Sequence, residues 1–88
     1  MYSFKISENL QGILAKLSKK DPQLYEQILK KINEVINCED VSHYKNLKYN
    51  LKDSKRVHIG HFVLVFQYVQ NEILFDDFDH HDNIYLKK

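Results

Sequence analysis

The amino-acid sequence predicts an α+β fold: an N-terminal strand, an antiparallel hairpin of two helices, and a three-stranded antiparallel meander that completes a four-stranded sheet. Three observations predict it. The N-terminal segment alternates apolar and polar residues, two segments carry apolar residues at helical spacing, and three strand-like segments joined by short turns follow. Strands joined by tight turns run antiparallel, and we expect the first strand to join as an edge neighbour in a four-stranded antiparallel sheet. The helices should cover one face, and the other face, or part of it, should stay open for a partner.

The first strand is expected within residues 1–6. Its alternate apolar residues share one face: Tyr2, Phe4 and Ile6. Ser7 is a good N-cap residue, and residues 8–19 after it are expected to form an amphipathic helix. The apolar residues of this helix recur at helical spacing: Leu10, Ile13, Leu14 and Leu17.

A second helix is expected to begin at Asp21-Pro22, with Asp21 as N-cap and proline at the first helical position, and to end near Asn37. Its apolar stripe has four main members, widened by three others: Leu24, Ile28, Ile32 and Val35, then Tyr25, Leu29 and Ile36. Because the connection between the helices is so short, they should form an antiparallel hairpin. Residues 38–54 after them are polar and irregular.

The chain then changes from helical spacing to alternation. In the strand expected at Arg56–Ile59, Val57 and Ile59 should face the core, and Arg56 and His58 should face the opposite side.

The next segment, Phe62–Val69, is apolar on both faces, as expected of a central strand. Gln70-Asn71 should turn the chain into a third strand of the meander at Glu72–Phe78. The polar tail 79–88 contains three residues that can dock: Ile84, Tyr85 and Leu86.

The composition excludes several classes of protein. With 88 residues the chain has room for one domain, residues 1–88, and its hydrophobic content of 43% is too high for disorder. The one cysteine, Cys38, excludes an internal disulfide and a multi-cysteine zinc site. The longest apolar run, Phe62–Phe66, is too short to span a membrane, and no secretory signal is recognisable, so we expect a cytoplasmic protein without a membrane partner.

Charge is divided between two parts of the chain, although the formal net charge is only +1. Within residues 41–60 one acid, Asp53, stands against five basic residues: Lys45, Lys48, Lys52, Lys55 and Arg56. Residues 71–82 carry five acids. The basic segment also holds Tyr44 and Tyr49, which could stack on bases, so it is a candidate nucleic-acid surface. The alternative is a solvated loop with ordinary surface lysines.

Four side chains are candidates for acid–base and phosphate chemistry: Arg56, His58, His81 and Tyr85. Histidine titrates near neutral pH and can accept or donate a proton. If the meander is correct, the first and last strands of it lie in one sheet, and the four groups can converge on one patch. Such a patch suits RNA cleavage, because one group deprotonates a ribose 2′-hydroxyl, another protonates the leaving oxygen, and a cation holds the phosphate. The alternative for each histidine is an ordinary surface or hydrogen-bonded residue.

Residues 76–82 are rich in carboxylates and imidazoles, which are ligands for cations. Alternate residues of a strand point to opposite faces, so few of these side chains could reach one ion. We therefore expect no metal site and no cofactor. The alternative role for this run is an acidic sheet edge that discourages strand pairing.

Three pieces of the second half form a pattern. The first is Leu47-Lys48-x-x-Leu51, the second is the basic-apolar-basic-apolar-Gly strand and turn that opens Arg56–Phe66, and the third is the tail Asp79–Tyr85. In this order and spacing, and with this sequence of elements, the whole chain resembles the RelE branch of the RelE/ParE superfamily of toxin–antitoxin toxins.

The resemblance implies a toxin of a type II toxin–antitoxin system, a ribosome-associated mRNA endoribonuclease that uses the 2′-hydroxyl as nucleophile and is inhibited by a RelB-like antitoxin. It implies that Arg56 and His58 stabilise the phosphate and assist proton removal. His81 would be the general acid, and Tyr85 would orient the substrate or stack on a base. The basic residues of the preceding segment would contact RNA: Lys45, Lys48, Lys52 and Lys55.

The sequence also departs from the family pattern. Val63 stands where the family has an arginine after the aromatic residue that opens the strand, and His58 and His81 replace commoner basic residues. We therefore expect cleavage to be weakened and to depend on histidine acid–base chemistry. The alternative is a non-catalytic or weakened protein of this fold that retains antitoxin binding, or a ParE-like protein that acts on DNA gyrase.

Overall fold

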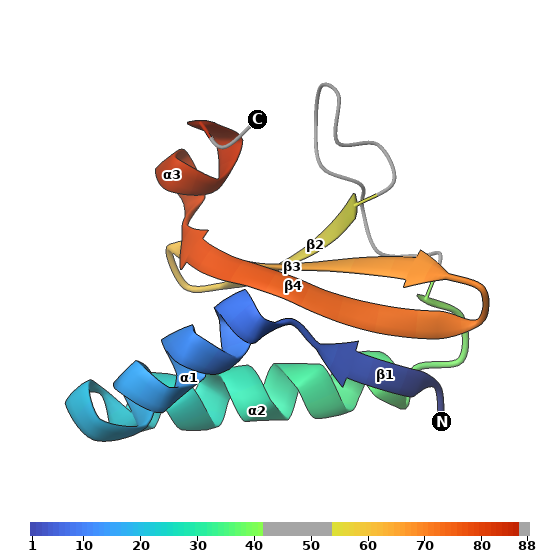
Figure 1. Cartoon of the computed structure of the whole chain (residues 1–88), viewed down its shortest axis with the longest axis horizontal. Coiled ribbons are helices and arrows are strands. Elements are labelled where there is room, and N and C mark those ends of the chain that lie inside the picture. The colour runs from blue at the N-terminus through green and yellow to red at the C-terminus, as the bar shows by residue number, and fades with distance from the viewer. Residues whose placement is uncertain (42–53, 87–88) are drawn as a thin grey trace.

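The two predicted helices form an antiparallel hairpin against one face of the sheet (Figure 1). Helix α1 spans Glu8–Lys20 and helix α2 spans Pro22–Ile36. The structure is a computed structural model that describes residues 1–41 and 54–86, with side chains as far as Ile84. The other elements are β1 (Ser3–Ile6), β2 (Ser54–Ile59), β3 (Phe62–Val69), β4 (Glu72–His80) and α3 (His81–Leu86).

Both predicted N-caps are confirmed. The hydroxyl of Ser7 accepts a hydrogen bond from the N–H of Leu10 at 3.1 Å, and the carboxylate of Asp21 accepts one from the N–H of Leu24 at 3.2 Å. These bonds satisfy N–H groups that have no partner inside the helix. The second helix ends at Ile36, next to the predicted boundary.

The sheet has the strand order β1-β4-β3-β2, and its last three strands form the predicted antiparallel meander. The prediction of a wholly antiparallel sheet is wrong, because β1 pairs with β4 in parallel, from Ser3 opposite Glu72 to Ile6 opposite Phe75. The helical hairpin explains the difference. It returns the chain to the end of the sheet where β1 begins, since the Tyr2 N–H donates to the Ile36 carbonyl at 2.7 Å. Strand β2 therefore starts at that end, and two reversals later β4 runs in the same direction as β1.

The main core lies between the helical hairpin and the sheet. Its members come from both predicted helical stripes and from alternate residues of the strands, and the largest that are fully buried include Phe66, Phe75, Leu10, Ile28, Leu64 and Ile73. Val57 and Ile59 of β2 belong to this side, as predicted. The apolar periodicity of the sequence therefore identifies the face that each element buries.

A β-bulge interrupts β4 opposite Val65 and Phe66. The Ser7 hydroxyl donates to the backbone carbonyl of Asp76 at 2.6 Å, so the start of α1 is tied to the bulge. The bulge shifts the alternation of β4 by one residue, and both Phe75 and Phe78 face the main core although they are an odd number of residues apart.

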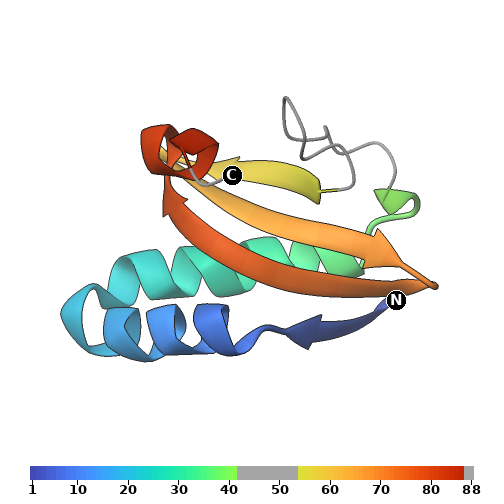
Figure 2. The same ribbon diagram turned by 45° about the horizontal axis from the view of Figure 1, so that its top comes forward.

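A short helix, α3, covers part of the second face of the sheet, on the side away from α1 and α2 (Figure 2). We predicted that this face would stay open wholly or in part, with a polar tail after a strand that ended at Phe78. Strand β4 instead continues to His80, and the tail is helical from His81. Ile84 docks as predicted, in a second apolar cluster with Val63 and Val65. None of the helices that the structure describes is long and apolar enough to span a membrane.

Candidate active site

Two of the four predicted catalytic residues lie on the face of the sheet that α3 covers. Arg56 pairs with Val65, and His58 pairs with Val63, across the β2–β3 ladder. Directly opposed residues share a face of a sheet, and Val63 and Val65 belong to the cluster under α3. Arg56 and His58 therefore border the place where α3 packs.

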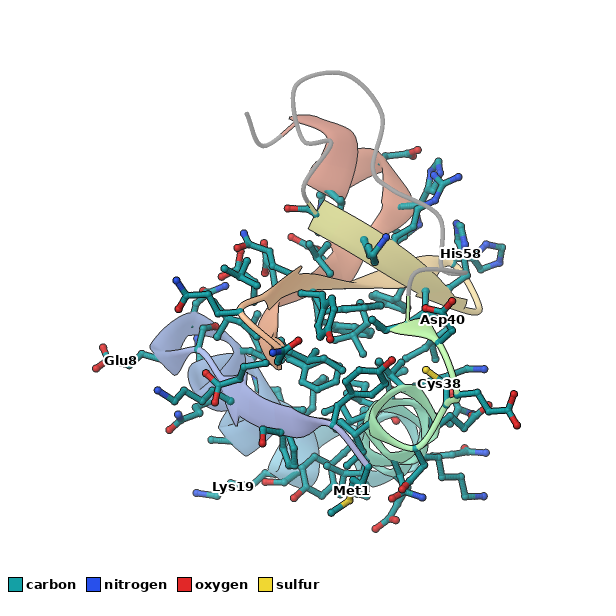
Figure 3. All side chains as sticks on the ribbon, turned by 90° about the vertical axis from the view of Figure 1, so that its right-hand side faces the viewer. Met1, Glu8, Lys19, Cys38, Asp40 and His58 are labelled. Atoms are coloured by element: carbon teal, nitrogen blue, oxygen red, sulfur yellow. The ribbon has the colours of Figure 1, made fainter. Side chains whose placement is uncertain are left out.

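His81 is the first residue of α3, and its imidazole stacks on that of His58. The ring centroids are 5.7 Å apart, with an angle of 26° between the ring planes. The side chain of His81 is 44% exposed, and His58 is exposed and projects outward from β2 (Figure 3). The structure thus brings together two imidazoles that are more than twenty residues apart in the sequence, and leaves both accessible to a ligand.

The backbone holds His81 in this position. Its N–H donates to the carbonyl of His61 at 2.9 Å, which joins the start of α3 to the turn between β2 and β3. On the other side of the helix start, a carboxylate oxygen of Asp82 lies 3.5 Å from Nδ1 of His81. The pair of imidazoles is therefore flanked by Arg56 on β2 and by an acid on α3, a combination that can bind an anion and transfer protons.

The other predicted site residues differ in what the structure describes. The backbone of Tyr85 belongs to α3, but its side chain lies outside the described part of the chain, as do Lys45, Lys48 and Lys52. Lys55 pairs with Phe66, a residue of the main core, so the structure does not bring it to the face of Arg56 and His58.

Val63, where the family pattern has an arginine, is completely buried beneath α3. A side chain at this position supports the helix that carries His81. A cation for the candidate site therefore comes from β2, where Arg56 pairs with the other buried valine of the cluster, Val65.

Sequence reasoning missed a second pair of histidines at the same end of the sheet. His61 and His80 stack with ring centroids 6.3 Å apart and 17° between the planes, and Phe62 meets His80 edge-on at 5.8 Å. The two-residue turn Gly60-His61 could have predicted this pair. A tight turn between β2 and β3 places His61 beside the start of β3, and in an antiparallel meander the end of β4 pairs with the start of β3.

An open groove of about 360 Å³ lies next to this second pair, between the helical hairpin and the strand ends. Its lining is mostly apolar: Ile13, Leu17, Leu24, Phe62 and Phe78, with Asp21 and Asp79. Arg56, His58 and His81 are not among the described residues that line this groove. Within the described residues, no group of three or more His, Cys, Asp or Glu side chains is arranged to hold a metal ion.

Comparisons with known proteins add the following. No protein-family model matches the chain. The chain is 50% identical to the candidate toxin RelE4 of Methanocaldococcus jannaschii over 91 residues, which cover 100% of this chain and 95% of that protein.

Two solved structures share the fold. YafQ of E. coli strain BL21(DE3) matches with a TM-score of 0.73 and 13% identity, over 97% of this chain and 99% of that one. The toxin–antitoxin complex RelBE2 of Mycobacterium tuberculosis matches with a TM-score of 0.62 and 15% identity, over 91% of this chain and 98% of that one. These two structures therefore share the fold over nearly the whole chain.

Proposed function

The chain belongs to the RelE family of toxins of toxin–antitoxin systems, and from this premise we propose that it is an endoribonuclease that cleaves mRNA on the ribosome. RelE-family toxins are generally endoribonucleases. The observation that carries the proposal for this chain is the stack of His58 on His81, with ring centroids 5.7 Å apart beside a strand that presents Arg56. Two imidazoles at this separation can act on the two oxygens that flank one phosphorus atom.

In the proposed reaction the ribose 2′-oxygen attacks the adjacent phosphorus. His58 accepts the 2′-hydroxyl proton as the new oxygen–phosphorus bond forms. The bond from phosphorus to the 5′-oxygen of the next nucleotide breaks, and His81 donates a proton to that leaving oxygen. The products are a 2′,3′-cyclic phosphate and a 5′-hydroxyl end. Each positioned acid or base typically contributes about 10²–10⁴-fold to the rate.

The neighbouring charges support these assignments. Asp82 lies on the Nδ1 side of the His81 ring, so we assign Nε2 as the nitrogen that serves the leaving oxygen. Arg56 presents the guanidinium that stabilises the phosphate as negative charge develops on it. Because residue 63 is an uncharged valine, no second cation comes from that position, and we propose that cleavage is slower than in relatives that carry an arginine there.

The remaining predicted residues extend the proposed RNA surface. We assign Tyr85 to stacking on a base or orienting the substrate. The basic residues that precede β2 would contact the RNA backbone: Lys45, Lys48 and Lys52. Lys55 is left out of this surface, because it lies on the other face of β2. Ribosome-bound mRNA as substrate makes the cytoplasm the expected compartment.

We further propose that a cognate RelB-like antitoxin holds this toxin inactive. RelE-like toxins pair with RelB-like antitoxins, as in the RelBE2 complex. The candidate site is on the surface, beside the exposed His58, so a partner that covers it would block the access of RNA. Inhibition by occlusion follows from that position.

The test is cleavage of a reporter mRNA on translating ribosomes by the purified protein, compared with His81→Ala. We expect discrete cuts with 5′-hydroxyl ends that are nearly lost in the variant. A DNA gyrase supercoiling assay is run in parallel. Inhibited gyrase with intact mRNA would favour the ParE-like alternative, and antitoxin binding with neither activity would favour a non-catalytic binding protein.

A further inference from the structure

His80 is the last residue of β4, directly before the short helix that carries His81. Its Nδ1 accepts a hydrogen bond from the backbone N–H of Asp82 at 3.3 Å. A backbone N–H can only donate, so Nδ1 of His80 carries no proton when this bond is made. The bond therefore requires the tautomer that has its hydrogen on Nε2.

This bond has the geometry of a helix N-cap. The side chain of the residue before a helix accepts from the second or third helical N–H, and His80 reaches the second. The first N–H of α3, that of His81, is taken by the carbonyl of His61 at 2.9 Å. A third contact comes from Asp79, whose carboxylate accepts a hydrogen bond from the side-chain amide of Asn83 at 3.2 Å. An imidazole thus supplies one of the contacts that fix the first turn of α3.

We propose that His80 is a positioning residue, whose neutral imidazole caps α3 and so holds His81 in its stack on His58. The inference deepens the proposed function and rests on it for its catalytic consequence. His80 does not itself touch the reacting atoms in this scheme. It acts through His81, the next residue of the chain, whose ring orientation depends on the start of the helix.

The cap makes the site sensitive to acid. Protonation of His80 places a hydrogen on Nδ1, where it opposes the N–H of Asp82, and adds positive charge at the positive end of a helix dipole. Charged and titratable groups surround this ring. The imidazole of His61 stacks on it, and a carboxylate oxygen of Asp82 lies 3.9 Å from its Nδ1. Asp79 precedes it in β4.

Asp21, from the helical hairpin, lines the adjacent groove together with Asp79. The side chains of His80 and Asp82 are 46% and 81% exposed, so solvent screens their attraction. The protonated ring would therefore exchange a cap for a weak surface ion pair, and we expect α3 to loosen as the pH falls through the range in which histidine takes up a proton.

Three substitutions separate a cap from other roles of this side chain. His80→Asn keeps an acceptor at the position of Nδ1, His80→Gln moves it one bond further out, and His80→Ala removes it. At pH 7.5 we expect ribosome-bound mRNA cleavage by His80→Asn within about twofold of the wild type, and about threefold to tenfold loss in the other two, as for a lost cap. His61→Asn, the same change one ring away, is the matched control and should stay near wild type.

The pH profile provides the second readout. Because the asparagine acceptor does not titrate, the ratio of wild-type to His80→Asn cleavage should fall as the pH is lowered from 7.5 to 5.5. The comparison at each pH isolates the part of the profile that depends on residue 80. A constant ratio, or equal losses in the asparagine and glutamine variants, would overturn the inference.

An NMR measurement needs no substrate. The amide resonance of Asp82 should titrate together with His80 in the wild type, and contacts between the His58 and His81 rings should persist in His80→Asn and weaken in His80→Ala. If these results hold while the wild type does not cleave RNA, the proposed function fails and the cap stands. If RNA is cleaved but neither readout depends on residue 80, the cap fails and the proposed function stands.

Discussion

Ile84 of α3 packs against Val63 of β3, and Val63 is the residue that pairs with His58 across the β2–β3 ladder. The two side chains are 3% and 0% exposed. This contact fixes α3 above the strand that carries Arg56 and His58. The stack of His81 on His58 therefore depends on a small apolar cluster as well as on the backbone bonds at the helix start.

Replacing Ile84 by alanine should impair cleavage through this contact. We expect a loss of about 2 kcal/mol in the free energy of unfolding, at the low end for a buried isoleucine because α3 lies at the edge of the fold. Ribosome-bound mRNA cleavage per folded molecule should fall by about tenfold or more. Urea unfolding and cleavage at a low temperature measure the two effects.

The control for this prediction is Ile32→Ala in the main core, where Ile32 is 5% exposed. It should destabilise the protein at least as much and leave cleavage per folded molecule near wild type. Equal losses of cleavage in the two variants would mean that Ile84 acts only through global stability.

Introducing the arginine of the family pattern, Val63→Arg, should not restore a stronger nuclease. The new charge would enter a fully buried position beneath Ile84, and an unpaired buried charge costs several kcal/mol. We expect loss of the cooperative unfolding transition or displacement of α3, measured by circular dichroism and NMR. Val69→Arg on the same strand, where the side chain is 54% exposed, should be tolerated. A stable and faster Val63→Arg variant would contradict this interpretation.

His58 and His81 should behave as one catalytic unit. We expect either alanine substitution to lower single-turnover cleavage on ribosomes by about 10²-fold or more. The double variant should be little worse than the more damaging single one, because residues that act together are strongly non-additive. If the loss of cleavage in the double variant equals the product of the two single losses, the histidines act independently. The double variant His81→Ala/Tyr85→Ala should be less toxic to growing cells than the wild type by about an order of magnitude or more.

A cognate antitoxin should cover the face that carries Arg56 and His58. In the complex, we expect His58 and His81 to be protected from chemical modification of imidazoles, and cleavage to be suppressed in proportion to the complex formed. A partner that contacts only the acidic residues 71–82 and leaves both imidazoles reactive would refute inhibition by occlusion.

Much of the fold follows from local patterns. The helical stripes and the alternation in β2 predict which side chains meet the core, and the structure confirms them. The caps at Ser7 and Asp21 predict where the two helices begin, and they are confirmed as well. The turn at Gln70-Asn71 is also as predicted, with φ of 53° and 64°, the left-handed conformations of a tight hairpin turn.

Other features depend on contacts that no local pattern carries. The parallel pairing of β1 follows from the path of the whole helical hairpin. The bulge in β4 breaks the two-residue period between Phe75 and Phe78. Helix α3 has only six residues, and among its residues with described side chains only Ile84 is buried. Its sequence therefore carries no helical periodicity that could be detected.

The candidate site was predictable in part. Counting alternate residues in β2 places Arg56 and His58 on one face, and the family resemblance selects His81. The acceptor role of His80 could not be predicted, because a histidine cap depends on the tautomer and on the residue being last in its strand. The burial of Val63 follows only once α3 is known to lie over β3.

The pairing of β1 with β4 has a consequence for how the polypeptide assembles. The hydrogen bond from Ser7 to Asp76 joins groups 69 positions apart along the chain, and such distant contacts form late and slow the acquisition of the native state. The hairpins of the meander involve near neighbours and can arise early. Until the N-terminal strand arrives, one side of β4 remains an unsatisfied template for intermolecular association. Strand β1 is thus among the last elements to be incorporated, and it replaces part of the exposed edge of β4 with a short edge strand of four residues.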